Sequence, residues 1–193
     1  MKKLGLLLLV AAACGKSDKS ASPPPVTIDV AGVNAAVPAE LTDKLVFEQQ
    51  DIVEERGRSK DVYSMAAPKG WTQDMKGFAS VKPPREPDLG FMTSLQVGSN
   101  CDGRCEPKDW AKVSEDVLFK QFRDGGTVVK DELKDTSHLM VAEKGNSTYV
   151  VYAWWAKGAK NYFSCYATLE APVKAAAPAF EKACQAVQVK KHD

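Results

Sequence analysis

Residues 161–169, with the sequence Asn-Tyr-Phe-Ser-Cys-Tyr-Ala-Thr-Leu, alternate between apolar and more polar side chains. Phe163, Cys165, Ala167 and Leu169 fall on the apolar side. Successive residues of a β-strand point to opposite faces of a sheet, so a period of two is typical of a half-buried strand. We therefore predict a strand here in which Cys165 faces the core.

The end of the chain carries another cysteine within a helical pattern. The apolar residues of this segment are spaced three, one and three positions apart: Phe180, Ala183, Cys184 and Val187. This spacing places them on one stripe of a helix, which we expect over residues 178–187, with Pro178 in its first turn. A helix that packs back across the preceding strand brings Cys184 to Cys165. We predict a disulfide between them, which closes a loop worth about 3 kcal/mol.

Three further strand candidates precede these elements. They cover residues 127–133, 138–143 and 148–155. Turn-forming residues separate the successive candidates: Asp135, then Gly145 and Asn146, then Gly158. Because these connections are short, we expect consecutive strands to pair antiparallel.

The beginning of the domain is less regular. Residues 26–30 are predicted to form a short strand, and residues 61–67 alternate well enough for another. Residues 68–70, Pro-Lys-Gly, are typical of a turn. Residues 41–53 show a mixed pattern that defines no element.

A clear period-two run follows a proline-containing loop. Its positions are Leu89, Phe91, Thr93, Leu95 and Val97, which predict one more strand. Pro107 then begins a predicted helix that runs to about Phe122, with Gly125 and Gly126 ending it. Together the patterns predict an α+β fold, in which helices pack on an antiparallel sheet and disulfides stabilise the domain.

The first residues of the chain have the composition of a targeting segment. Lys2 and Lys3 precede an apolar run of ten residues, 4–13. A helix needs about 20 residues to span the bilayer core, so residues 1–13 are predicted to be a removable signal peptide. Residues 10–14, Val-Ala-Ala-Ala-Cys, resemble the lipobox of bacterial lipoproteins, where a signal peptidase cuts before an acylated cysteine.

Acylation of Cys14 would anchor the mature chain in the membrane, with simple secretion as the alternative. Gly15 follows this cysteine, and by resemblance to the enteric sorting rule it favours the outer membrane. Residues 14–25 are rich in Ser, Lys and Pro and predict a flexible tether. Residues 26–193 are long enough for a single domain with its own core.

Four cysteines remain in the domain once Cys14 carries lipid, an even number that favours two disulfides in an oxidising compartment. Cys101 and Cys105 lie in the turn-rich sequence Asn-Cys-Asp-Gly-Arg-Cys-Glu-Pro, and we expect them to form the second pair. The alternative is a thiol-redox or metal site that uses Cys101, Cys105 and His138. The sequence lacks the strand-helix-strand pattern of a thioredoxin fold, so we favour the structural disulfide and predict no metal and no cofactor.

The charge balance argues against binding to nucleic acids. Four of the 26 Lys and Arg residues and one of the 25 acidic residues precede Val26, which leaves the domain with 22 basic and 24 acidic side chains. Without a basic excess, contacts to a phosphate backbone have little electrostatic support. A hydrolase would have to use His138 as its base, but no Gly-x-Ser-x-Gly motif is present. We predict no enzymatic activity.

Residues 63–71, Tyr-Ser-Met-Ala-Ala-Pro-Lys-Gly-Trp, resemble the strand, Pro, Gly, Trp opening of PsbP-like and Mog1-like domains. The likeness continues through a middle helix, an antiparallel meander and a last helix with an aromatic residue, Phe180, and so covers residues 61–189. Bacterial relatives of that fold include small lipoproteins. The resemblance implies an α-β-α sandwich and a role as an assembly factor, stabiliser or partner-binding module, and it implies no catalytic residues.

Trp154 and Trp155 are neighbours on a predicted strand and must point to opposite faces of the sheet. If helices cover both faces, both indoles belong to the core. If one face is bare, its tryptophan marks a binding surface, which Tyr152 would extend. The predicted protein is thus a non-catalytic envelope lipoprotein that binds another envelope protein or a small ligand, with thiol-redox or metal handling as the alternative.

Overall fold

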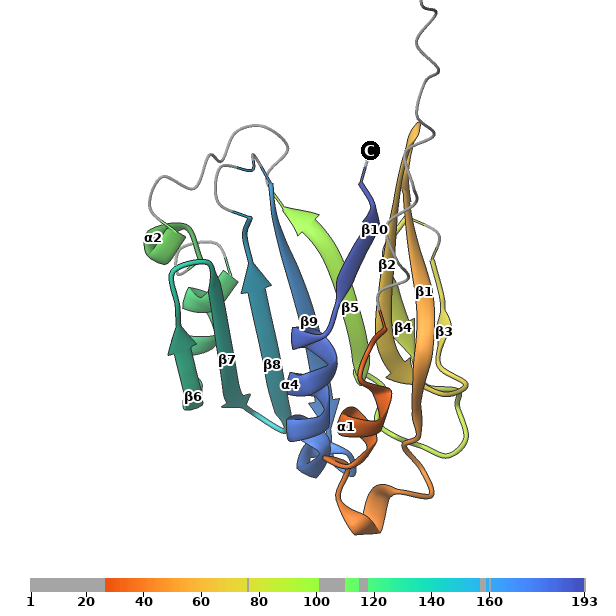
Figure 1. Ribbon diagram of the computed structural model, residues 1–193. Helices are drawn as coiled ribbons and strands as arrows, with labels where there is room; N and C mark the ends of the chain where they lie inside the picture. Colours follow the sequence, from red (N-terminus) through yellow and green to blue (C-terminus); the bar gives the residue numbers. More distant parts are fainter. Residues whose placement is uncertain are drawn as a thin grey trace, which may run out of the picture.

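The computed structural model in Figure 1 describes residues 27–75, 77–100, 110–114, 118–156, 159 and 161–192. The helices and helical turns are α1 (Val30–Asn34), η1 (Ala39–Leu41), α2 (Trp110–Ser114), α3 (Lys120–Arg123), η3 (Lys174–Ala176) and α4 (Ala177–Gln185). The strands are β1 (Phe47–Arg56), β2 (Ser59–Pro68), β3 (Thr72–Gln73), β4 (Ser80–Lys82), β5 (Ser94–Asn100), β6 (Thr127–Leu133), β7 (Ser137–Lys144), β8 (Ser147–Trp154), β9 (Tyr162–Glu170) and β10 (Gln188–Lys191).

The strands form two antiparallel sheets, which confirms the predicted α+β class. One sheet has seven strands in the order β3-β4-β5-β9-β8-β7-β6, and the other has three in the order β1-β2-β10. The predicted meander is present, because each strand from β6 to β9 pairs antiparallel with the next. Gly145 has φ 60° in the two-residue turn between β7 and β8, where a left-handed conformation suits the twist of a hairpin.

One face of the seven-stranded sheet, here called the inner face, packs against helices and the three-stranded sheet. It carries Leu95, Val97, Leu139, Val141 and Cys165, and these residues share one hydrophobic cluster with α1, α4 and the three-stranded sheet. The aromatic rings of Phe47, Trp71 and Phe180 meet in this cluster. The Phe180 ring lies 5.2 Å from that of Phe47 and 5.8 Å from that of Trp71. Figure 1 shows α4 lying across the sheet on this side.

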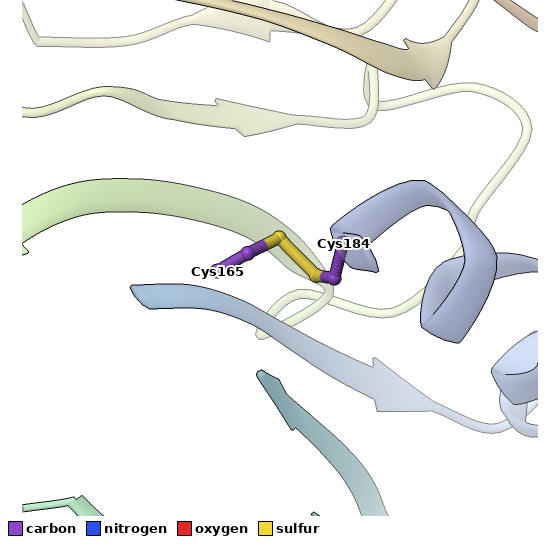
Figure 2. Close-up of a disulfide and its surroundings, with 2 residues drawn as sticks. All are labelled: Cys165 and Cys184. Carbon is purple, nitrogen blue, oxygen red and sulfur yellow. A yellow bond between two sulfur atoms is a disulfide. The ribbon is translucent and has the colours of Figure 1, made fainter. Parts of the chain in front are cut away.

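The predicted disulfide between Cys165 and Cys184 is present. It joins β9 to α4, with the two Cα atoms 5.3 Å apart and both residues fully buried (Figure 2). The alternation in the strand predicted that Cys165 faces the core, and the helical spacing predicted the same for Cys184. Because α4 packs back across β9, the two sulfur atoms meet.

The opposite face, here called the outer face, carries Gln96, Met140, Val151 and Tyr166. Helices α2 and α3 cover the part of this face near β7 and β8. The buried residues of this second cluster are Trp110, Phe119, Phe122, Met140, Ala142, Val151, Ala153 and Tyr162. Within the described ranges none of them belongs to β4 or β5, so this helical cover stops short of the other side of the sheet.

Two predictions near the start of the domain were wrong or incomplete. The expected strand at residues 26–30 is not formed over its described residues, because Asp29 instead caps α1: its Oδ1 accepts a hydrogen bond from the Gly32 N–H at 2.8 Å. The unassigned residues 41–53 include most of β1, which pairs with β2 along its whole length.

At the other end of the domain, the final helix is followed by β10, which the sequence patterns did not predict.

The period-two run from Leu89 to Val97 is also only partly a strand. Leu89, Thr93, Leu95 and Val97 are buried as expected, but Phe91 is 92% exposed and β5 begins at Ser94. The chain turns at Gly90, which has φ 98° and whose carbonyl accepts a hydrogen bond from the Thr93 N–H. This turn directs Phe91 outward.

The predicted helix over residues 107–122 is helical in its described segments α2 and α3. The signal peptide, Cys14 and the tether lie outside the described residues and stay predictions. Within the described part of the chain, no helix combines the length and the apolar character needed to cross a membrane.

Candidate binding groove

Four large apolar side chains project into solvent beside the uncovered part of the outer face. The exposed fractions are 52% for Met75, 51% for Phe78, 92% for Phe91 and 57% for Met92. Single exposed hydrophobic residues are ordinary, but a group around one depression is typical of an interaction site. All four line one cavity of about 360 Å³ above β5 and β9.

A second cavity of about 270 Å³ continues from the first, because Phe78, Gln96 and Tyr166 belong to the walls of both. It extends along β5 to Gly98 and Asn100. The two cavities together are called the outer groove. Since the groove follows β5 from its first to its last residue, its length is about 20 Å at about 3.4 Å per residue.

The floor of the outer groove explains why none of the described helices packs there. Its positions alternate along the two central strands and are mostly small or polar: Ser94, Gln96, Gly98 and Asn100 on β5, and Ser164, Tyr166 and Thr168 on β9. Burying such groups under an apolar helix would leave hydroxyls and amides without partners. The walls, by contrast, are largely apolar, with Leu118 and Phe122 on one side and Phe78 on the other.

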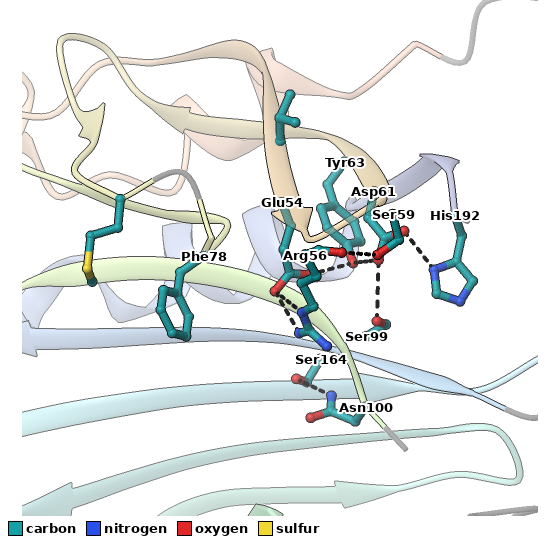
Figure 3. A network of polar contacts seen from close by, with 12 residues as sticks. Glu54, Arg56, Ser59, Asp61, Tyr63, Phe78, Ser99, Asn100, Ser164 and His192 are labelled. Atoms are coloured by element: carbon teal, nitrogen blue, oxygen red, sulfur yellow. Dashed lines mark hydrogen bonds and ion pairs between the residues drawn. The ribbon is translucent and has the colours of Figure 1, made fainter. Parts of the chain in front are cut away.

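An arginine forms the end of the groove farthest from Phe91. Arg56 extends from β1 across β5 towards Asn100 and Ser164 (Figure 3). Its Nε and Nη2 donate to Glu54 Oε1 at 2.9 and 2.6 Å. The Arg56 side chain is 44% exposed whereas that of Glu54 is 3% exposed, so the charge that faces the groove here is positive.

Gly98 lies directly beside this ion pair. A Cβ atom at Gly98 would lie 3.7 Å from Glu54 Oε2 and 4.0 Å from Arg56 Nη2. A longer side chain at this position would therefore press on the ion pair. Arg56 thus passes beside Gly98 as it extends from the three-stranded sheet to the outer face of the seven-stranded one.

Behind Arg56 lies a buried polar network that fixes Glu54 (Figure 3). The Tyr63 hydroxyl lies 3.2 Å from Asp61 Oδ2 and 3.4 Å from Glu54 Oε2. Asp61 also contacts the Ser99 hydroxyl at 3.4 Å and His192 Nδ1 at 3.0 Å. Burial, and then the charges of Asp61 and Glu54, raise the pKa of Tyr63, which stays a hydrogen-bond donor across the physiological range.

The lining of the outer groove combines apolar, polar and charged side chains. Glu54 is engaged by Arg56 and Tyr63, and the described lining contains neither histidine nor cysteine. The groove instead offers apolar side chains at one end, a guanidinium at the other, and amide and hydroxyl groups between them.

The predicted aromatic residues lie away from this groove, on opposite faces of the sheet as expected. Trp154 is half-buried on the inner face, where its ring stacks on those of Tyr152 at 5.5 Å and Phe163 at 5.6 Å. Trp155 is half-buried with the outer-face cluster, stacks on Trp110, and donates its Nε1–H to the Ala159 carbonyl at 2.7 Å. A binding surface formed by Tyr152, Trp154 or Trp155 stays a prediction.

His138, the histidine of the alternative redox or metal site, is buried on the outer face. Its ring stacks on Phe119 with 3.8 Å between centroids, and its Nε2 lies 2.7 Å from Asp131 Oδ1. Partial burial acts to raise the pKa of Asp131, but the hydrogen bond from His138 and the ion pair with Arg123 outweigh it and lower that pKa. This pairing of Asp131 and His138 joins β6 to β7.

Cys101 and Cys105 lie outside the described residues, so their pairing stays a prediction and so does the alternative site. Among the residues that the structure places, no group of three His, Cys, Asp or Glu side chains is arranged to hold a metal ion.

A comparison of the chain with protein-family models, curated proteins and solved structures found no match.

The sequence prediction missed the outer groove. A signal was present, because residues 94, 96, 98 and 100 are small or polar and alternate with Leu95, Val97 and Ser99. That pattern marks one face of β5 as open to solvent. The positions of Phe91 and Arg56 beside this face depend on turns and contacts between strands that are distant in sequence.

Proposed function

We propose that this protein is a non-catalytic binding module of the bacterial cell envelope. In this proposal Cys14 carries a lipid anchor, the tether of residues 14–25 connects it to the folded part, and the outer groove binds a partner or ligand. We further propose a relationship to PsbP-like and Mog1-like domains, for which the strand-Pro-Gly-Trp sequence and the antiparallel sheet with helices are the support.

One observation carries the proposed binding role: the exposed Met75, Phe78, Phe91 and Met92 gather around a single groove. Methionine side chains are flexible and polarizable, so they adapt to apolar surfaces of different shapes. Keeping such a group in solvent is unfavourable unless a partner covers it.

Site-specific photocrosslinking tests this role. A photoreactive phenylalanine analogue is introduced at position 91 and, as a control, at position 129, where Val129 is 61% exposed on the edge strand β6. After irradiation in intact envelopes, we expect an adduct from position 91 that is lost when Phe78→Ser and Met92→Ser are added. Equal adduct formation at both positions, or none at position 91, would contradict the proposal.

Metabolic labelling tests the anchor separately. The wild-type chain should incorporate a labelled fatty acid and fractionate with outer membranes, whereas Cys14→Ala should do neither. Label that persists in Cys14→Ala would place the acyl group elsewhere, and an unlabelled, soluble wild-type chain would favour simple secretion.

A further inference from the structure

The polar groups on the floor of the outer groove are suited to a polypeptide backbone. The Asn100 Nδ2 donates to the Ser164 Oγ at 2.8 Å. A side-chain amide and a hydroxyl can each both donate and accept hydrogen bonds. Gln96 adds an exposed amide between the two cavities. Groups of this kind can bind both the N–H and the carbonyl groups of a peptide backbone.

The shape of the groove also matches an extended chain. Its length of about 20 Å accommodates roughly six residues at about 3.3 Å each. A compact ligand would occupy one of the two cavities and leave the other empty.

The two ends of the groove differ in chemistry and therefore set a direction. At one end the exposed charge belongs to Arg56, whose partner Glu54 is buried. At the other end the walls are the exposed Phe91 and Met92. The Lys82 and Asp74 side chains at that end pair with each other at 3.0 Å and are similarly exposed, so they add no net charge.

We propose that the outer groove binds an extended polypeptide segment with a carboxylate near Arg56 and large apolar side chains near Phe91 and Met92. The proposal rests on the binding role argued above and names the class of ligand. An acyl chain fits the groove less well, because it would cover Gln96, Asn100 and Ser164 without offering them hydrogen bonds.

The proposal is tested with fluorescein-labelled octapeptides and fluorescence anisotropy. The probe has two leucines at one end, two aspartates at the other and four Ser or Thr residues between them, and it is made in both chain directions. The protein is the full chain carrying Cys14→Ser, so that neither an acyl anchor nor detergent competes for the groove. We expect one direction to bind, and its affinity to fall about tenfold when the aspartates become asparagines.

The protein variants locate the contacts. Phe91→Ser and Met92→Ser should each weaken binding of the leucine probe by about tenfold and leave the affinity of a probe with serines in place of leucines unchanged. Val129→Ser, on β6 and about as exposed as Met92, should change nothing. Replacing Arg56 by an uncharged residue would leave the buried Glu54 without its cationic partner. The role of the charge is therefore tested by replacing the aspartates of the peptide, and Arg56→Lys is the protein variant that keeps the positive charge.

Two outcomes would overturn the proposal, and they separate it from the binding role. If sodium oleate binds with a dependence on Phe91 and Met92 while none of the peptides does, the groove is a binding site but its ligand is an acyl chain. If neither oleate nor any peptide binds, and position 91 gives no specific photoadduct, both proposals fail. Peptide binding that ignores the aspartates and the leucines also rejects the assigned ligand.

Discussion

The two faces of the seven-stranded sheet contrast in how they are completed. On the inner face, α4 and the three-stranded sheet bury the apolar side chains, and the disulfide between Cys165 and Cys184 fixes the helix to β9. On the outer face, α2 and α3 cover the part near β7 and β8, while the outer groove lies open over β5. The same sheet thus supports a closed core on one side and an open groove on the other.

Two phenylalanines illustrate the contrast. Phe180 is fully buried on the inner face and Phe91 is 92% exposed beside the outer groove. The residue type is identical, so the difference in environment alone should decide what each contributes. We expect the inner-face residues to determine stability and the outer-groove residues to determine binding.

Phe180→Ala should have the largest effect on stability. The substitution removes a ring that packs against Phe47 and Trp71 and leaves a cavity, so we expect the free energy of unfolding to fall by about 3 to 5 kcal/mol. Urea denaturation followed by circular dichroism measures it. A loss below about 1 kcal/mol would show that the inner-face core tolerates the cavity and would weaken the contrast.

Removal of the disulfide should follow in size. Replacing Cys165 and Cys184 together by alanine opens a loop with a sequence separation of 19 residues, and the unfolded chain then gains entropy worth about 3 kcal/mol. Urea denaturation under non-reducing conditions gives the value. Binding of the leucine-aspartate probe should be unchanged in the folded variant. If the variant were as stable as the wild type, the disulfide would not stabilise the fold.

Tyr63→Phe probes the buried polar network that links Glu54, Asp61 and Ser99. The hydroxyl serves both Asp61 and Glu54 in a fully buried position, and its loss should lower the free energy of unfolding by about 1 to 3 kcal/mol. Tyr152→Phe is the matched control on the inner face, where the ring stacks and the expected change is below about 0.5 kcal/mol. Equal effects in the two variants would mean that the network does not depend on the phenol.

The ion pair of Asp51 and Lys190 should have a smaller effect that depends on pH. The hydrogen bonds from Lys190 lower the pKa of Asp51 below its usual 3.8, so the pair stabilises the fold above that pH. The contribution is lost as the pH falls through the lowered pKa. Asp51→Asn should cost less than about 1 kcal/mol at neutral pH, because both side chains are nearly half exposed.

A thermal-unfolding series across pH checks this prediction. The difference between wild type and Asp51→Asn should shrink below pH 3.8 and should also shrink at high salt. Lys190→Gln should give the same loss, and the double variant should lose no more than either single one. A difference that persists in acid would assign the effect to something other than the charge.

The parts of the fold that the sequence predicted are those governed by local patterns. Alternation over residues 161–169 and the helical spacing of Phe180, Ala183 and Cys184 were sufficient to predict the disulfide, because each pattern orients its cysteine independently. The meander followed for the same reason, since its turns are short. These elements need only neighbouring residues to be recognised.

The outer groove could not be predicted in this way because contacts between distant residues create it. Glu170 Oε2 accepts a hydrogen bond from the Met92 N–H at 2.9 Å, and the Glu170 N–H donates to Thr93 Oγ1 at 3.2 Å. These bonds cross 78 and 77 positions of the sequence and hold the turn that exposes Phe91. The reach of Arg56 past Gly98 likewise depends on how the two sheets meet.

Phe91→Ser should have the smallest effect on stability of all these changes. A side chain that is 92% exposed buries little area, so the free energy of unfolding should change by less than about 0.5 kcal/mol. Urea denaturation in parallel with Phe180→Ala provides the matched comparison within one residue type. If Phe91→Ser destabilised the fold by more than about 1 kcal/mol, Phe91 would contribute to the core. It could then not be an exposed wall of the outer groove. If Phe91→Ser left stability unchanged and reduced binding of the leucine-aspartate probe, the two results together would show that Phe91 contributes to ligand binding and not to stability.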